Sequence, residues 1–122
     1  MALFVRPGDV FLADCPARLA IDIIASKWSV VVLVGLHRGA RRHGELRELI
    51  GGISSKVLTD TLRRLERHGL VVRQDFRTVP RRVEYALTPL GHSLVPHLLG
   101  LAEWAELNGE AVHASLFGLD DS

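Results

Sequence analysis

The sequence holds one cysteine and no long hydrophobic run, and these two absences exclude several classes of protein. Because Cys15 is the only cysteine, neither a disulfide within the chain nor a zinc site built on several cysteines can form. The longest apolar run, residues 30–36, is far short of the roughly 20 residues that span a bilayer. The first residues also lack the basic, apolar and cleavage-site succession of a secretory signal. The 122 residues suit a single domain, and we expect a cytoplasmic protein without membrane contact.

Motifs that indicate an enzyme or a metal site are missing as well. The six histidines show neither an HExxH arrangement nor any pair spaced i, i+4. Glu45 and Glu48 share a helical spacing, but no further catalytic group accompanies them. The double glycine at 51–52 lacks the additional glycine and the lysine of a phosphate-binding loop. We therefore expect no enzymatic activity, no metal and no cofactor.

Net charge is small, but the charges are unevenly distributed along the chain. The whole sequence carries +1. Residues 37–82 hold twelve Lys/Arg against five Asp/Glu, a local charge of +7, whereas residues 83–122 hold six acidic residues and no Lys or Arg, a local charge of −6. A basic excess in one segment is expected when that segment faces a polyanion. Charge counts alone leave open a basic face that is only solvated.

Hydrophobic spacing predicts three helices in the first part of the chain. Residues 15–24 suit a helix that carries Pro16 in its first turn. Residues 26–39 are ambiguous, because their β-branched side chains favour a strand while their length and caps favour a helix. Residues 42–52 predict a short helix that ends at a double glycine.

The stretch from residue 53 to residue 69 predicts an amphipathic helix with clear ends. Ser54 is a good N-cap, with Ile53 and Leu58 at the two positions of a hydrophobic staple, and Gly69 is the stop. Leucines form the inward stripe: Leu58, Leu62 and Leu65. At 100° per residue the opposite face holds polar and basic residues: Ser55, Lys56, Thr59, Asp60, Arg63 and Arg67.

A hairpin and a long helix are predicted next. Residues 70–87 are typical of two strands joined by a turn around Val79-Pro80, with arginines clustered at the tip. Thr88-Pro89 begins the last helix, in which leucines recur at helical spacing. Pro96 lies inside this helix, and its missing N–H and its ring clash predict a bend or a break there.

Together these elements predict a mainly α fold with a small β-hairpin wing, a winged helix-turn-helix. We expect an N-terminal arm over 1–14, the domain with its dimerisation helices over 15–107, and a C-terminal helical extension over 108–122. A helix of this kind fits the major groove of DNA, and arginines at a hairpin tip can contact phosphates or the minor groove. The alternative is a protein-interaction module that binds no nucleic acid and whose arginines meet an acidic partner.

Several segments also resemble a known family. "CPARLAIDIIASKW", "GELRELIGGISSKVLTDTLRRLERHGLV" and "VPRRVEYALTPLG", with the later "LAEW", resemble the HxlR-type transcription regulators, a branch of the MarR-like winged-helix proteins. The resemblance runs from Cys15 to Trp104. It implies a dimeric bacterial regulator and a buried helix over residues 26–36. Two positions depart from the family: His43 stands where an aromatic residue is usual, and Arg81 where a second proline is often found.

The resemblance implies particular residues for DNA contact. On the recognition helix these are Ser54, Ser55, Lys56, Thr59 and Arg63. On the wing they are Arg77, Arg81 and Arg82, and before the third helix they are Arg41 and Arg42. The sequence identifies no effector.

Apolar rows on the first and last helices predict a homodimer, because one small domain is unable to cover them alone. The expected interface consists of Leu19, Ile23, Leu94, Leu98, Leu101 and Trp104. Two-fold symmetry then predicts an inverted-repeat operator in double-stranded DNA.

Cys15 has two interpretations. Its place before Pro16 puts the thiol at a helix N-terminus, which favours the reactive thiolate, and the resemblance adds that some family members respond to oxidants or electrophiles through a cysteine near this position. Against sensing, Asp14 opposes a thiolate and cysteines are often simply buried. With no second cysteine, oxidation can lead only to an intersubunit disulfide, a mixed disulfide or an oxyacid.

Overall fold

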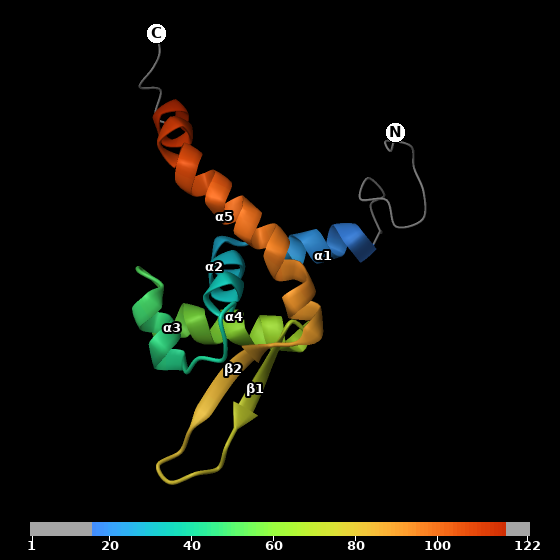
Figure 1. Ribbon diagram of the computed structural model, residues 1–122, viewed down its shortest axis with the longest axis vertical. Helices are drawn as coiled ribbons and strands as arrows, with labels where there is room; N and C mark the ends of the chain where they lie inside the picture. The colour runs from blue at the N-terminus through green and yellow to red at the C-terminus, as the bar shows by residue number, and fades with distance from the viewer. Residues whose placement is uncertain (1–15, 117–122) are drawn as a thin grey trace.

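The structure, a computed structural model, describes residues 16–116 and consists there of helices and one antiparallel hairpin (Figure 1). The elements in chain order are α1 (Pro16–Ile24), α2 (Lys27–Gly35), α3 (His43–Leu49), α4 (Ser55–Arg67), β1 (Val71–Asp75), β2 (Val83–Leu87) and α5 (Pro89–Leu116). A helix pair is followed by a hairpin that extends from the domain. The predicted mainly α fold with a β-hairpin wing is confirmed.

α2 resolves the ambiguous segment in favour of a helix. Ser26 caps it, because the Ser26 Oγ accepts a hydrogen bond from the backbone N–H of Ser29 at 3.1 Å. Val32 and Leu33 are fully buried in the core. Burial therefore outweighs the strand preference of the valine run, since tertiary packing routinely overrides local propensity. The helix implied by the family resemblance is confirmed.

α4 begins and ends where the sequence predicted. The Ser54 Oγ accepts a hydrogen bond from the backbone N–H of Val57 at 3.1 Å. Ile53 and Leu58, the two residues of the predicted staple, are both buried. After the last turn Gly69 adopts a φ of +80°, a left-handed conformation that glycine reaches without strain. The cap and the stop together fix the extent of the helix.

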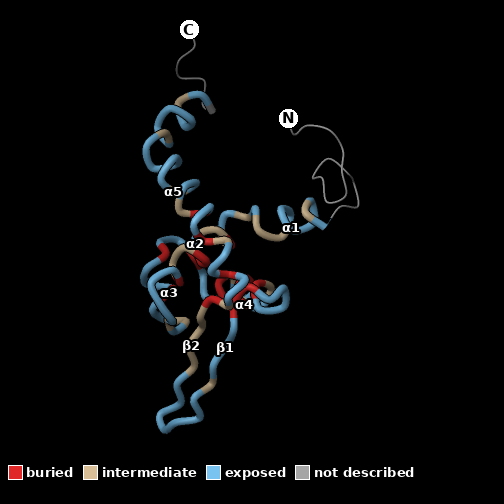
Figure 2. Tube along the Cα trace, turned by 45° about the vertical axis from the view of Figure 1, so that its right-hand side comes forward, coloured by how far each residue is buried: buried red, intermediate tan, exposed pale blue. Residues whose placement is uncertain are grey.

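The core lies where α2, α3, α4 and the base of the hairpin meet (Figure 2). Fully buried side chains come from each helix that surrounds it: Leu33 from α2, Leu46 from α3, Leu62 from α4 and Val95 from α5. α1, by contrast, contributes no buried residue. α3 and α4 are therefore held by the buried side chains that they contribute to the core, while α1 lies on the surface.

α5 is a long helix with two different halves. It continues through Pro96 without a break and its ribbon bends along its course (Figure 1), so the bent helix rather than the break is the outcome. Near its start, Gly91 packs so closely on Leu70 that an added Cβ would overlap the Leu70 carbonyl oxygen. From residue 99 to residue 115 no residue is buried. The second half of α5 therefore projects from the core.

The two strands form an antiparallel hairpin whose base belongs to the core. Val71 lies opposite Leu87 at that base, and both are buried. The loop of residues 76–82 lies at the far end and is exposed throughout, as the predicted turn requires. Arg41 and Tyr85 exchange two backbone hydrogen bonds, of 2.9 and 2.8 Å, which tie the segment before α3 to β2.

Candidate nucleic-acid interface

The outward face of α4 presents polar and basic side chains on a rigid support. Leu58, Leu62 and Leu65 are each at most 1 % exposed, so the inward stripe holds the helix on the core. The outward residues confirm the predicted face, since all are exposed except Thr59, which is half-buried: Ser55, Lys56, Thr59, Asp60, Arg63 and Arg67. α3 packs beside α4, which gives the pair a helix-turn-helix arrangement (Figure 1).

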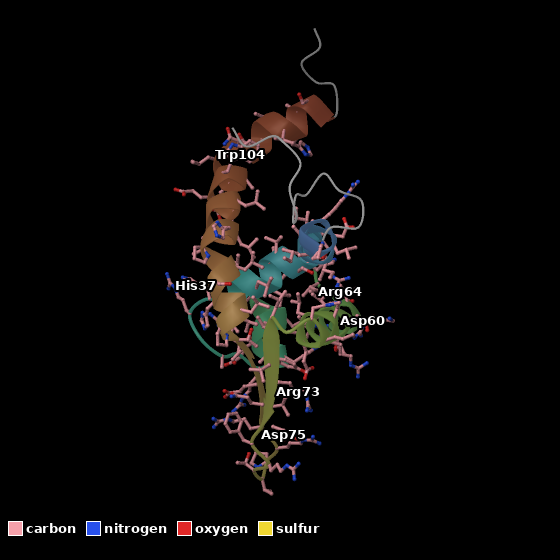
Figure 3. The ribbon with its side chains drawn as sticks, turned by 90° about the vertical axis from the view of Figure 1, so that its right-hand side faces the viewer. His37, Asp60, Arg64, Arg73, Asp75 and Trp104 are labelled. Atoms are coloured by element: carbon pink, nitrogen blue, oxygen red, sulfur yellow. The ribbon has the colours of Figure 1, made fainter. Side chains whose placement is uncertain are left out.

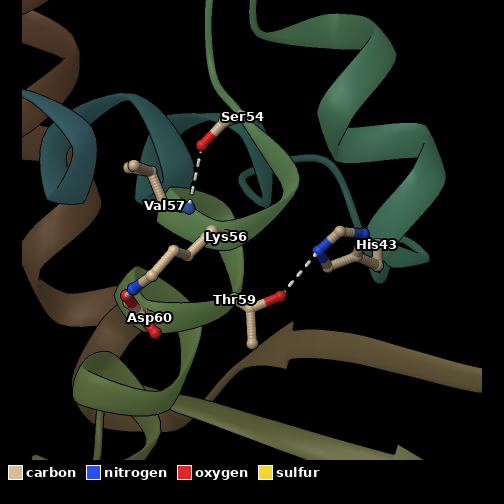
Figure 4. A network of polar contacts seen from close by, with 6 residues as sticks. All are labelled: His43, Ser54, Lys56, Val57, Thr59 and Asp60. Carbon is tan, nitrogen blue, oxygen red and sulfur yellow. Dashed lines mark hydrogen bonds and ion pairs between the residues drawn. The ribbon is translucent and has the colours of Figure 1, made fainter.

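Lys56 and Asp60 form an ion pair across one turn of this face (Figure 4). The Lys56 Nζ lies 2.8 Å from the Asp60 Oδ2, and both side chains are largely exposed. The hydrogen bond and the charge of Lys56 lower the pKa of Asp60 below its usual value. Because water screens an exposed pair of this kind, it contributes little to stability. Lys56 can therefore leave Asp60 for an external anion at small cost.

His43 reaches from the start of α3 to the outward face of α4. Its Nε2 lies 3.1 Å from the Thr59 Oγ1, and both residues are half-buried. Either the ring nitrogen or the hydroxyl is the donor, depending on the tautomer of the imidazole. The sequence marked His43 only as a departure from the usual aromatic residue. The structure adds that its ring touches a predicted DNA contact.

The arginines in the second half of α4 point in different directions. Arg63 and Arg67 are exposed and make no hydrogen bond or ion pair within residues 16–116. Arg64 turns inward, where its Nη2 donates to the Ser26 Oγ at 3.0 Å and to the Ser29 Oγ at 2.9 Å (Figure 3). Arg64 thus joins α4 to the start of α2. Sequence periodicity had separated it from the outward face but gave no hint of these partners.

Asp75 lies at the end of β1, next to the wing loop of residues 76–82, and makes two contacts with that loop (Figure 3). Its Oδ2 lies 2.6 Å from the Arg81 Nη2, and its Oδ1 accepts a hydrogen bond from the backbone N–H of Arg77 at 2.9 Å. These two interactions, that with the Arg77 backbone first, lower the pKa of Asp75 below its usual value. The Arg77 side chain makes no hydrogen bond or ion pair in the described part of the chain. Among the described residues, therefore, the Arg81 guanidinium has a partner and the Arg77 guanidinium has none.

Arg82, the third predicted wing residue, is held on two sides. Its Nε lies 3.0 Å from the Glu84 Oε2, and its guanidinium carbon lies 4.3 Å from the centre of the Phe76 ring. A cation over an aromatic face is attracted by the ring quadrupole. Arg82 therefore stiffens the hairpin beside the loop.

Arg41 and Arg42 precede α3 but differ in what they contact. The Arg41 Nε donates to the Gly35 carbonyl at 2.7 Å, which satisfies the end of α2. The backbone N–H of Arg42 donates to the Glu45 Oε1 at 2.7 Å, whereas the Arg42 side chain is exposed and unpaired among the residues described. This hydrogen bond caps α3 and gives Glu45 a structural role in place of a catalytic one.

The predicted dimer residues are partly exposed and partly buried. Leu19, Leu101 and Trp104 are 53 %, 52 % and 56 % exposed. Ile23 and Leu94 line a groove of about 540 Å³ between α1 and the start of α5. Leu98 is buried in the core of the chain itself. Cys15, the thiol candidate, lies outside the described residues.

Residues 16–116 contain neither a candidate metal site nor a membrane-spanning helix. No group of three His, Cys, Asp or Glu side chains lies close enough there to hold a metal ion. None of the described helices combines the length and the apolar character needed to cross a membrane.

Comparisons with known proteins point to one group. A family model described as HxlR-like helix-turn-helix matches residues 23–113. The uncharacterised HTH-type transcriptional regulator YtfH of Escherichia coli (strain K12) is 40 % identical over 104 residues, which cover 85 % of this chain and 82 % of YtfH. The solved structure of ytfH from Salmonella typhimurium has a TM-score of 0.77 at 40 % identity, covering 88 % of this chain and 96 % of that one. The redox regulator HypR in its reduced form has a TM-score of 0.73 at 34 % identity, covering 81 % and 98 %.

Proposed function

The chain belongs to the HxlR-like helix-turn-helix family of transcriptional regulators, and we propose that it acts as a homodimer on an inverted-repeat operator in duplex DNA. Its relatives are transcriptional regulators rather than enzymes, in agreement with the expected lack of enzymatic activity. The proposal concerns how the regulator meets DNA and a second copy of itself.

The outward face of α4 is the observation that carries the proposal. An α-helix fits the major groove, where short polar side chains approach base edges and basic ones bond guanine or phosphate. Ser54, Ser55, Lys56 and Thr59 stand at the N-terminal end of α4, and Arg63 follows on the same face. Because the buried leucine stripe holds the helix, these groups form a rigid set, which favours selective contact.

The wing arginines divide by their existing partners. We assign Arg77 to a phosphate or to the minor groove, because its guanidinium makes no hydrogen bond or ion pair within residues 16–116. Arg81 and Arg82 are paired with Asp75 and Glu84, so we assign them chiefly to shaping the loop and secondarily to DNA. Arg42 is exposed and suits a phosphate, while Arg41 mainly supports the end of α2.

The homodimer is supported by apolar side chains that a single protomer leaves uncovered. Leu19 on α1 and Leu101 and Trp104 on α5 are each more than half exposed. Ile23 and Leu94 add the apolar groove between these helices, whereas Leu98 is buried in the core and does not line it. A two-fold interface that covers this surface presents two copies of α4. Half-site centres should then lie about 34–36 Å apart along the duplex.

Selection of bound sites from random duplex DNA tests the proposal. We expect enrichment of an inverted repeat with that spacing. Lys56→Ala and Arg63→Ala should relax base preference at one position each, by about 1–3 kcal/mol. Arg18→Ala, an exposed change on α1, is the matched control and should keep the preference. Failure to enrich any sequence would contradict DNA recognition and favour an interaction module with an acidic protein partner.

We further propose that the regulator responds to thiol-reactive stress through Cys15. The support is the likeness to HypR, which is named a redox regulator and has been solved in reduced and oxidised forms. Cys15 immediately precedes Pro16, the first residue of α1, so a modified thiol would displace the helix that lines the dimer groove. Operator affinity is compared before and after diamide in the wild type and in Cys15→Ser. An unchanged wild-type affinity after modification would make Cys15 a packing residue.

A further inference from the structure

We propose that His43, at the start of α3, sets base specificity through the neighbouring recognition helix α4, because it holds the hydroxyl of Thr59 and so decides which group Thr59 offers to a base pair. The inference rests on the proposed function and deepens it. Within residues 16–116, the contact between the His43 Nε2 and the Thr59 Oγ1, at 3.1 Å, is the side-chain hydrogen bond that joins α3 to the outward face of α4.

Thr59 occupies the centre of the surface that we assign to DNA. Ser55, Thr59 and Arg63 follow one another at i, i+4 and i+8, so they form one row along the outward face. The two end members of the row are exposed, while Thr59 is half-buried. Figure 4 shows the imidazole of His43 directed from α3 toward the Thr59 hydroxyl. A substitution of His43 therefore alters the position of the Thr59 side chain, the middle member of the row.

The contact with His43 matters because a threonine side chain carries both a hydroxyl and a methyl group. Its hydroxyl holds one donor hydrogen and two acceptor lone pairs, and its methyl group is apolar. In a helix an unpartnered threonine divides between rotamers, because its Oγ1 can also bond the carbonyl three or four residues earlier. The bond to His43 fixes the Oγ1 on the side of α3 and the methyl group away from it.

In the major groove these two groups read different features. A threonine methyl packs against the C5-methyl of thymine, whereas the hydroxyl bonds donors or acceptors on base edges. When the Thr59 rotamer is fixed, the methyl group and the hydroxyl each face one part of the groove. When the side chain rotates freely, either group can face the same base. His43 thus acts as a positioning residue that sharpens base choice through Thr59.

The aromatic residue usual at this position of the family supplies a matched variant. Phenylalanine in place of His43 occupies similar space but offers no nitrogen to the Thr59 hydroxyl. His43→Phe therefore removes the hydrogen bond while keeping a ring on the half-buried site. His43→Gln keeps the hydrogen bond and removes the ring, because the glutamine amide can donate to or accept from the Thr59 hydroxyl.

The experiment measures binding to the selected operator, to its single-base variants and to random duplex. His43→Phe should weaken operator binding by about three- to ten-fold, the range of one net hydrogen bond, without changing affinity for random duplex. His43→Gln should restore most of that loss. Thr59→Val should cause a similar loss, and adding His43→Phe to Thr59→Val should change little more, because the two residues act through one bond. His92→Phe, exposed on α5, is the control and should behave as the wild type.

The outcomes separate this inference from the proposed function. A wild-type protein that prefers no sequence overturns both. A wild-type protein that prefers its operator, with an unchanged base profile in His43→Phe or with losses that add in the double variant, overturns the inference alone. Thermal unfolding of each variant completes the test, since loss of stability without a change of base profile would reduce His43 to a packing role.

Discussion

α4 and the second half of α5 both lie at the surface, but they stand in opposite relation to the core. α4 buries its leucine stripe and turns hydroxyl and cationic side chains outward. Residues 99–115 of α5 include no buried residue, although Leu99 packs partly against the core, and Leu101 and Trp104 are more than half exposed. α4 thus buries its apolar side within the chain and presents a polar face. The second half of α5 leaves apolar side chains exposed, and we propose that a second copy of the chain covers them.

Charge divides the two regions in the same way. Residues 37–82, which include α3, α4 and the wing loop, carry +7, whereas residues 83–122 carry −6. A duplex attracts the first region and repels the second, because its phosphates present a dense negative charge. The two surfaces therefore suit different partners: the basic face of α4 suits a polyanion, and the apolar side chains in the acidic second half of α5 suit an apolar surface.

Removing one buried leucine of α4 should have the largest effect. Leu62 is 1 % exposed, so Leu62→Ala should lower the free energy of unfolding by about 2–5 kcal/mol through lost burial and a residual cavity. Leu101 is 52 % exposed in one chain, so Leu101→Ala should cost far less in the same assay at a protein concentration too low for the proposed dimer to form. Urea unfolding at one protein concentration measures both. Equal losses would erase the distinction between the two helices.

Removing the exposed tryptophan of α5 should act on association. Truncation of a buried interface tryptophan typically costs about 2 kcal/mol or more, so Trp104→Ala should raise the dimer dissociation constant by roughly thirty-fold. Sedimentation velocity at micromolar concentration measures the shift, with Glu103→Ala as the neighbouring control. A wild-type protein that sediments as a monomer and still binds its operator fully would refute the role given to α5.

Substitutions of two wing arginines should have smaller effects, which differ between Arg77 and Arg81. The Arg77 guanidinium has no partner among the residues that the structure describes, while Arg81 is held by Asp75. Arg77→Ala should weaken binding to all sequences and flatten the plot of log K against log salt by about 0.9, the value for one lost phosphate contact. Arg81→Ala should change that slope less. The assignment fails if Arg81→Ala alters the slope as much as Arg77→Ala or more.

The acid dependence of the wing should be the smallest effect. The pKa of Asp75 is depressed below its usual 3.8 by the Arg77 backbone N–H and by Arg81. Such a group stabilises the fold above its unfolded pKa, and that contribution is lost as pH falls through the lower, folded pKa. The loop should therefore loosen only below about pH 4, and Asp75→Asn should remove this dependence. An NMR titration that gives Asp75 its ordinary pKa would contradict the assignment.

Local signals in the sequence were sufficient for much of the fold. The Ser54 cap, the staple and Gly69 defined α4 because each acts on residues only a few positions away. The hairpin turn around Val79-Pro80 was predicted for the same reason. α2 was different, since its valines favour a strand and only burial against other elements decides for a helix. The family resemblance supplied that decision where periodicity could not.

Side-chain contacts between residues distant in the sequence could not be predicted from such local signals. The contact of His43 with Thr59 spans 16 residues, and that of Arg64 with Ser26 spans 38. Periodicity assigns a side chain to a face of its helix but not to a group on another helix. It also fails to separate core from interface, because Leu98 shares a row with the exposed Leu101 and yet is buried within its own protomer.

The salt dependence of operator binding tests most directly the central claim that the face of α4 and the wing bind duplex DNA. Affinity of the wild-type protein for the selected operator and for random duplex is measured from about 50 to 200 mM salt. We expect a straight line of log K against log salt, with a slope of about −0.9 for each contacted phosphate, and tighter binding to the operator throughout. A flat response, or equal affinity for the two duplexes at physiological salt, would contradict it.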